Sequence, residues 1–209
     1  MQREVWDRKY AETESLWSRG PNRFLVAEGA DLPPGRVLDL ACGEGRNALW
    51  LAELGWEATG VDFSEVAIGK ARERASATGV DIEFVRADLL EYEPEHDRYD
   101  LVLVFYLQLP AAELRLVLER ASAALAQGGT LLLVGHDLAN VTEGVGGPSD
   151  PQVLYTPDDI VAALPDLEIE RAERVLRDVI DADRPAIDAL VRARKTGTRS
   201  RGSRSRKES

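Results

Sequence analysis

Short apolar runs alternate with amphipathic helical stretches through most of this 209-residue chain. The runs are nearly continuous in apolar residues, which is typical of parallel strands buried on both faces. An order of strand, helix and strand places such strands in one sheet with helices on either side. The sequence therefore predicts an α/β fold with a doubly wound, mostly parallel sheet. The predicted strands are residues 37–41, 57–61, 82–86, 100–105 and 130–134.

Helical spacing of apolar residues fills the gaps between these strands. Ser64 is the expected N-cap of one helix, and Gly55 and the pair Gly128-Gly129 are expected helix stops. Helices are predicted over residues 47–54, 64–77, 111–126 and 157–164. The buried positions expected on the second and third of these helices are Ala67, Ile68, Ala71, Ala75, Leu114, Val117, Leu118, Ala121 and Leu125.

The two ends of the chain depart from this alternation. Residues 167–174 and 187–193 are strand candidates with a short polar connection, and they predict a β-hairpin at the sheet edge. Ahead of the first strand, residues 3–12 and 22–29 predict two helices. These helices and their connection carry the aromatic residues Trp6, Tyr10, Trp17 and Phe24.

Charge divides the chain into two unlike parts. Residues 192–209 hold eight Lys/Arg and one Glu, whereas residues 1–191 hold 18 Lys/Arg and 36 Asp/Glu. A segment rich in Ser, Gly and Arg buries too little surface to offset the entropy of ordering. We therefore expect one domain over residues 1–191 and a basic, disordered tail over 192–209. A contact of this tail with nucleic acid is the alternative.

The single cysteine, Cys42, excludes an internal disulfide and a thiolate-rich metal site. We expect Cys42 to be a small residue packed under the neighbouring loop. The first 15 residues have no apolar run of the kind found in signal peptides. No stretch approaches the roughly 20 apolar residues that a membrane span requires. These features predict a cytoplasmic location.

Residues 43–48, GEGRNA, fit the pattern G-x-G-x-x-G/A at a predicted strand-to-helix junction. Glycines at this place let backbone N–H groups approach a ligand, and Asp62 is placed to accept from ribose hydroxyls. The pattern alone does not separate NAD from other adenosine-bearing cofactors. Asp39 favours S-adenosylmethionine, because a carboxylate repels a pyrophosphate but attracts a sulfonium or an ammonium group. Asp88, directly after the third strand, is placed to accept from an adenine amino group.

Residues 37–72, VLDLACGEGRNALWLAELGWEATGVDFSEVAIGKAR, resemble motif I and its acidic successor in class I S-adenosylmethionine-dependent methyltransferases. The runs RADLLEY (86–92) and YDLVLVFYLQLP (99–110) resemble the adenine-contact segment and the fourth strand of that family. The overall match covers roughly residues 1–195 and is nearest to the small tellurite-resistance and thiopurine methyltransferase branch. It implies a seven-stranded sheet of order 3-2-1-4-5-7-6 with strand 7 antiparallel and helices on both faces.

The resemblance also implies a cofactor site, which residues 1–35 would cover. The methionine part of S-adenosylmethionine would be held by Asp39, Ala41, Gly43 and Gly45. Asp62 would bind the ribose, with Phe63 against the adenine or the ribose. The adenine would lie beside Ala87, Asp88 and Leu89, and Phe105 would close the far wall.

Acceptor-side residues are expected after the fourth and fifth strands. Tyr106 and Gln108 follow one strand, and His136 and Asp137 follow the other; His136 and Tyr106 are the catalytic candidates. His96 lies in a polar run and is expected at the surface. Residues 139–156 form a long Gly/Pro loop that predicts a lid with Tyr155 as its anchor. No metal is expected, because the sulfonium already makes the methyl group electrophilic and the protein has only to align the reactants.

The sequence thus predicts a methyltransferase for a small acceptor such as a thiol, a metalloid oxyanion or a metabolite. The run after the fourth strand lacks the N/D-P-P-Y/F segment that often accompanies methylation of exocyclic base amines. Three alternatives remain: an RNA- or ribosome-associated methyltransferase guided by the tail, a non-catalytic S-adenosylmethionine sensor, and an NAD-dependent oxidoreductase, which Asp39 disfavours. The sequence contains no signal for the oligomeric state.

Overall fold

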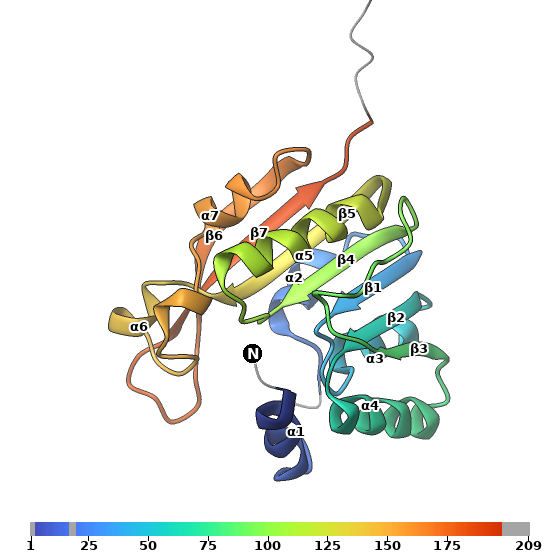
Figure 1. The fold of residues 1–209 in the computed structure, drawn as a ribbon, viewed down its shortest axis with the longest axis horizontal. Coiled ribbons are helices and arrows are strands. Elements are labelled where there is room, and N and C mark those ends of the chain that lie inside the picture. Colours follow the sequence, from blue (N-terminus) through green and yellow to red (C-terminus); the bar gives the residue numbers. More distant parts are fainter. Residues whose placement is uncertain (1–2, 17–19, 198–209) are drawn as a thin grey trace, which may run out of the picture.

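A computed structural model describes residues 3–16 and 20–197 of the chain. One seven-stranded sheet runs through it in the order β3-β2-β1-β4-β5-β7-β6 (Figure 1). Strands β1 to β5 are parallel to one another, and β7 pairs antiparallel with both β5 and β6. The predicted fold class, strand order and antiparallel strand are confirmed. The strands are β1 (Arg36–Leu40), β2 (Glu57–Asp62), β3 (Ile82–Arg86), β4 (Tyr99–Phe105), β5 (Leu125–His136), β6 (Glu168–Arg177) and β7 (Ala186–Arg194).

Helices cover both faces of the sheet (Figure 1). The buried side chains of α5 and α7 pack on one face, and those of α2, α3 and α4 pack on the other. Helix α1 packs against α4 at the end of the sheet where the parallel strands terminate (Figure 1). The helices are α1 (Arg3–Ala11), α2 (Arg23–Gly29), α3 (Arg46–Glu53), α4 (Glu65–Thr78), α5 (Ala111–Ala124), α6 (Asn140–Glu143) and α7 (Pro157–Ala162), with a 3₁₀ turn, η1 (Pro151–Val153).

Helix α4 follows the sequence prediction closely. The hydroxyl of Ser64 caps it by accepting a hydrogen bond from the amide of Ala67. Gly79, in the left-handed conformation with a φ of 72°, ends it. Its buried residues are the four predicted ones, Ala67, Ile68, Ala71 and Ala75.

The predicted end of α5 is wrong. The helix stops at Ala124, and Leu125 already has the extended conformation of β5, where it pairs with Tyr99. Leu125 is buried as expected, but as part of the sheet. The pair Gly128-Gly129 lies inside the irregular first part of β5, where the amide of Gly128 donates to the carbonyl of Lys195. The glycines therefore shape a strand rather than stop a helix.

The C-terminal hairpin of β6 and β7 lies at the sheet edge, as predicted. Strand β7 continues to Arg194, three residues beyond the domain end expected at 191. Lys195 then donates from Nζ to the carbonyl of Leu125 and to the carboxylate of Asp97, each at 2.7–2.8 Å. Of the predicted tail, residues 198–209 lie outside the described part of the chain. Within the described part, no helix is both long and apolar enough to cross a membrane.

Candidate functional site

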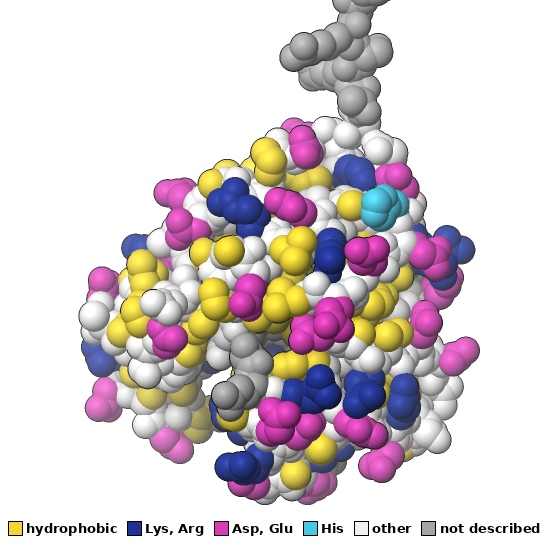
Figure 2. Space-filling model, in the orientation of Figure 1, with side chains coloured by type: hydrophobic (Ala, Val, Ile, Leu, Met, Phe, Trp, Pro, Cys, Tyr) yellow, Lys and Arg dark blue, Asp and Glu magenta, His cyan; other side chains and the backbone are white. Residues whose placement is uncertain are grey.

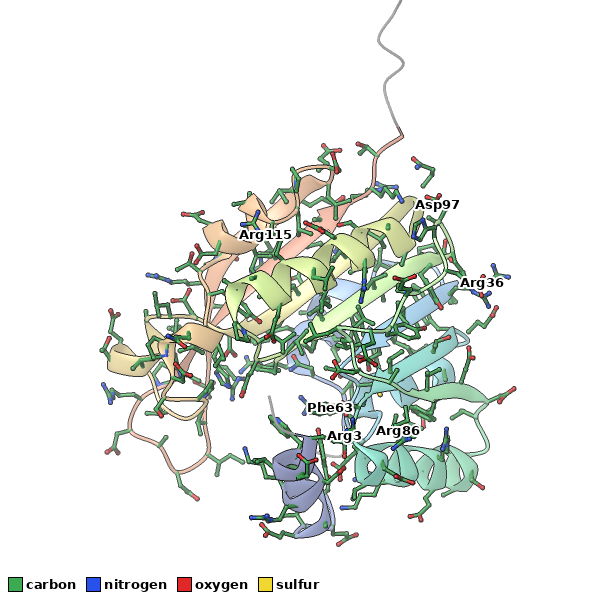
Figure 3. The ribbon with its side chains drawn as sticks, in the orientation of Figure 1. Arg3, Arg36, Phe63, Arg86, Asp97 and Arg115 are labelled. Atoms are coloured by element: carbon green, nitrogen blue, oxygen red, sulfur yellow. The ribbon has the colours of Figure 1, made fainter. Side chains whose placement is uncertain are left out.

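A cavity of about 1050 Å³ lies where the parallel strands end. Because β1 to β5 run in the same direction, the residues that follow them meet at one edge of the sheet. Phe63 lies at this edge, on the side that α1 approaches, whereas Arg36 and Asp97 lie at the opposite edge (Figure 3). The predicted site residues that line the cavity are Ala41, Gly43, Asp62, Phe63, Asp88, Leu89, Phe105, Tyr106, Gln108 and His136.

The loop between β1 and α3 bends sharply beside the cavity. Ala41 has a φ of 61° and Gly43 a φ of 54°, both in the left-handed region. At Ala41 this conformation is strained, and such strain persists where the surrounding structure imposes it. A Cβ on Gly43 would lie 2.8 Å from the hydroxyl of Tyr10, so the glycine also allows α1 to close over the loop.

Asp62 ties this loop to β2. One carboxylate oxygen accepts from the amide of Gly43 and the other from the amide of Ser64, each at 2.9 Å. Burial raises the pKa of Asp62 above its ordinary value, and the two amide hydrogen bonds oppose that shift. Each carboxylate oxygen retains a second lone pair, so Asp62 can still accept hydrogen bonds from a ligand.

Asp39 lies in β1 behind the loop and is 1% exposed. Within the described residues, neither of its carboxylate oxygens has a partner at hydrogen-bond geometry, and the backbone amide of Ala48 is close enough to lower the pKa of the group slightly. Burial raises the pKa of Asp39 to about 7; Arg46 opposes this shift, and Asp62 adds to it. A buried carboxylate without partners favours a ligand that brings a positive charge to it.

Arg46 and Asn47 are cavity residues that the sequence analysis did not assign to a role. Arg46, at the start of α3, lines the cavity, and burial lowers the pKa of its guanidinium. Asn47 accepts from the amide of Asn22 through its side-chain oxygen at 2.9 Å, which fastens the start of α2 to α3. Their position inside the pattern of residues 43–48 was the available signal.

At the end of β3, Asp88 and Leu89 line the cavity. One oxygen of Asp88 accepts from the amide of Leu90 at 2.9 Å, so this carboxylate also caps its own turn. Three predicted site residues, Asp39, Gly45 and Ala87, are not among those that line the cavity. Gly45 is the N-cap of α3, and its Cα faces Phe84 and Ala71. Cys42 is buried, and burial raises the pKa of its thiol.

Beside the opposite part of the cavity lies a polar cluster from β5, β6, β7 and the residue that follows β4. Asp188 of β7 is fully buried and accepts from the hydroxyl of Tyr106 at 2.8 Å and from Nε of Arg177 at 2.7 Å. Nδ1 of His136 lies 3.2 Å from the other oxygen of Asp188. Tyr106, with a φ of 54°, is a second strained residue at a strand end. The sequence analysis missed Asp188 and Arg177; a lone acid in an apolar strand was the only signal.

Two segments cover the cavity: helix α1, described first, and part of the predicted lid. Trp6 and Tyr10 of α1 line it from one side. Lys70 of α4 holds this helix by donating to the carbonyl oxygens of Tyr10 and Thr13. Glu44, 2% exposed, accepts from the amide of Leu16 at 3.1 Å. Trp17, which was also expected in this cover, lies outside the described residues.

The predicted lid over residues 139–156 contains α6 and η1, and its residues 145–148 line the cavity. Tyr155 is buried in the core, and its hydroxyl lies beneath Gly135. Asp137 is also buried and pairs with Arg174 at 3.0 Å, away from the cavity lining. His96 is exposed, as expected. Within the described residues, no group of three or more His, Cys, Asp or Glu side chains could hold a metal ion.

Comparison with known proteins shows which folds this chain resembles. Residues 37–129 match the family model described as a methyltransferase domain. A structure reported for the conversion of a disulfide bond into a thioacetal group during echinomycin biosynthesis superimposes with a TM-score of 0.72 and 28% identity, covering 95% of this chain and 94% of that one. TehB from Haemophilus influenzae superimposes with a TM-score of 0.71 and 21% identity, covering 93% of this chain and 68% of that one. The chain has a Rossmann-like methyltransferase fold.

Curated relatives are similar to about half of the chain. The demethylmenaquinone methyltransferase of Thermus thermophilus is 34% identical over 114 residues, which are 54% of this chain and 52% of that protein. The ribosomal RNA small subunit methyltransferase C of Alcanivorax borkumensis is 33% identical over 115 residues, which are 52% of this chain and 35% of that protein. The chain thus spans about half of one relative and about a third of the other.

Proposed function

We propose that this protein transfers a methyl group from S-adenosylmethionine to a small acceptor. The observation that carries the proposal is the buried, unpartnered carboxylate of Asp39 behind a glycine loop that Asp62 holds in place. Asp62 lines the cavity and Asp39 lies behind that lining, so both carboxylates attract a sulfonium or an ammonium group and repel the pyrophosphate of NAD.

The cavity offers a place for each part of the cofactor. The loop from Ala41 to Gly45 suits the methionine part, with Arg46 suited to its carboxylate. Asp62 suits the ribose hydroxyls, and Phe63 suits a stacked ring. The adenine fits beside Asp88 and Leu89, which follow Ala87 and line the cavity, with Phe105 as the wall.

When bound, the sulfonium supplies an electrophilic methyl group. The chain has to hold the acceptor in line with it and exclude water, and orientation alone can supply roughly 7–11 kcal/mol. Helix α1 and residues 145–148 cover the cavity for this purpose. Tyr106 and His136 line its other end and are the candidates for contact with the acceptor.

A small acceptor is favoured by the placement of the C-terminal segment. Strand β7 runs antiparallel to β5, so it ends at Arg194 on the edge opposite the cavity (Figure 1). On the face drawn in Figure 2, acidic and basic side chains are interspersed rather than separated into one basic field. The curated relatives include methyltransferases named for ribosomal RNA and for demethylmenaquinone, and the fold also resembles TehB. Assays with acceptors of each class, including those of the tellurite-resistance and thiopurine branch suggested by the sequence, distinguish them.

Calorimetric titration with S-adenosylhomocysteine tests the cofactor. We expect micromolar binding by the parent protein and a loss of about tenfold or more in Asp62→Ala, because that variant removes ligand hydrogen bonds and loosens the loop. Asp81→Ala, at an exposed position before β3, is the matched control and should bind like the parent. Binding of NAD in place of S-adenosylhomocysteine would overturn the proposal, and so would unchanged binding by Asp62→Ala with its fold intact.

A further inference from the structure

The imidazole of His136 is enclosed on several sides at the acceptor end of the cavity. Its Nδ1 lies 3.2 Å from Oδ1 of Asp188, and neither atom has another partner within the described residues. The ring of Tyr106 lies with its centroid 5.0 Å from that of His136, at an interplanar angle of 58°. A Cβ on Gly147 would lie 2.8–2.9 Å from the imidazole ring. With Nδ1 directed at Asp188 and the side chain lining the cavity, Nε2 is the nitrogen left for a ligand.

Asp188 fixes which nitrogen of His136 carries the proton. Burial opposes ionisation of Asp188, but hydrogen bonds from His136, Arg177 and Tyr106 outweigh it and hold its pKa below the ordinary value. An ionised carboxylate only accepts hydrogen bonds, so Nδ1 must donate. The lone pair of the neutral imidazole is then on Nε2, on the side left to a ligand.

Arg177 and Tyr106 contact Asp188 beside the imidazole. The charge of Asp188 is matched by Arg177, whose Nε lies 2.7 Å away. Burial, followed by the charge of Asp188, raises the pKa of Tyr106 to about 12, so Tyr106 stays protonated as the donor to Asp188. A positioned neutral imidazole is the group that most often acts as a general base in enzymes.

We infer that His136 is the general base of the reaction and that the acceptor is a thiol, hydroxyl or amine that gives up a proton, rather than a preformed anion such as a metalloid oxyanion. This inference rests on the proposed methyl transfer. Nε2 takes the proton as the electron pair of the acceptor atom forms the bond to the methyl carbon. The carbon–sulfur bond breaks with its electron pair going to sulfur, and the imidazolium later returns its proton to water. Asp188, Tyr106 and Arg177 are positioning residues.

Nitrogen-15 NMR of the labelled protein tests the protonation of His136 directly. The chain has two histidines, and His96→Gln removes the exposed one, which assigns the signals. We expect the neutral Nδ1–H form for His136, with a shift toward a mixture of both neutral forms in Asp188→Asn. A neutral Nε2–H form, or a charged imidazole at the pH of turnover, would overturn the inference.

Methylation of probe acceptors of graded acidity separates a base from a structural residue. The set comprises aliphatic thiols, which are mostly protonated at neutral pH, an acidic aromatic thiol, which is ionised there, and a phenol and an aromatic amine. We expect His136→Gln to lower kcat/KM for the protonated probes by about 10²–10⁴-fold and to change it little for the ionised thiol. His96→Gln is the matched control and should behave like the parent.

The outcomes distinguish this inference from the proposed function. An equal loss for protonated and ionised probes would make His136 structural and overturn the inference. If the parent binds S-adenosylhomocysteine but methylates selenite or tellurite and none of the proton-bearing probes, the acceptor class is wrong and cofactor binding stands. If S-adenosylhomocysteine does not bind, the proposed function itself fails.

Discussion

At the scale of single residues, Asp39 lies behind the cavity lining, and its carboxylate is buried with no partner at hydrogen-bond geometry within the described residues. Burial raises its pKa to about 7, whereas an aspartate in an unfolded chain titrates near about 3.9. Between these values the folded state keeps a proton that the unfolded state has released. The free energy of unfolding therefore falls as the pH rises from about 4 to about 7, by roughly 3–4 kcal/mol at most.

Asp39→Asn should remove this contribution, because the amide does not ionise. We expect the variant to become more stable relative to the parent as the pH rises from about 4 to about 7, and the difference to level off above that range. Urea unfolding at a series of pH values measures it. Parallel pH profiles for the two proteins would show that Asp39 is not a neutral, buried acid in the unliganded fold.

At the scale of elements, the lid segment around α6 meets the acceptor end of the cavity at Gly147. This residue has a φ of 73°, and an added Cβ would lie 2.8–2.9 Å from the ring of His136. Gly146 has a similar φ of 68° but nothing within 4 Å of its Cβ position. A substitution at either glycine would therefore strain the backbone to a similar extent. Only at Gly147 would the new side chain also collide with the imidazole of His136.

Gly147→Ala should therefore lower methyl transfer more than Gly146→Ala does. Both variants should lose about 1 kcal/mol of stability from the left-handed backbone, as thermal unfolding would show. We expect Gly147→Ala alone to lower kcat by about tenfold or more by displacing the imidazole, with binding of S-adenosylhomocysteine unchanged. Equal rates in the two variants would contradict a role of this contact in placing His136.

The same elements show how far the sequence could predict the structure. The buried face of α4 and the strands of the parallel sheet could be read from apolar spacing, because burial on both sides demands it. Leu125 could not be assigned to a helix or a strand, because a buried leucine is equally compatible with the last turn of α5 and the first residue of β5. The glycine loop with Asp62 was readable from local spacing. Asp188 reaches His136 only through the pairing of β5 with β7, and no spacing along the chain encodes that contact.

At the scale of the whole molecule, the basic C-terminal segment begins inside the fold. Ala193 of β7 is fully buried and pairs with Leu131 and Ile169 on its two sides. Arg192 donates to the carbonyl of Glu28 at 2.7 Å, and Lys195 reaches Asp97 at 2.8 Å. Removing the segment from residue 192 would cut a strand, so a loss of activity in that deletion would not distinguish a substrate-binding tail from a damaged sheet.

A pair of truncations separates these roles. Ending the chain at residue 191 should destabilise it by at least about 2 kcal/mol through lost strand hydrogen bonds and burial, and lower Tm by roughly 4–8 °C. Ending it at 197 keeps β7 and the contacts of Lys195, so Tm and S-adenosylhomocysteine binding should match the full chain. Because β7 ends on the edge opposite the cavity, we also expect the 197 truncation to leave turnover of a small acceptor unchanged. If that truncation instead abolished salt-sensitive binding to RNA together with turnover, the acceptor would be a nucleic acid held by residues 198–209.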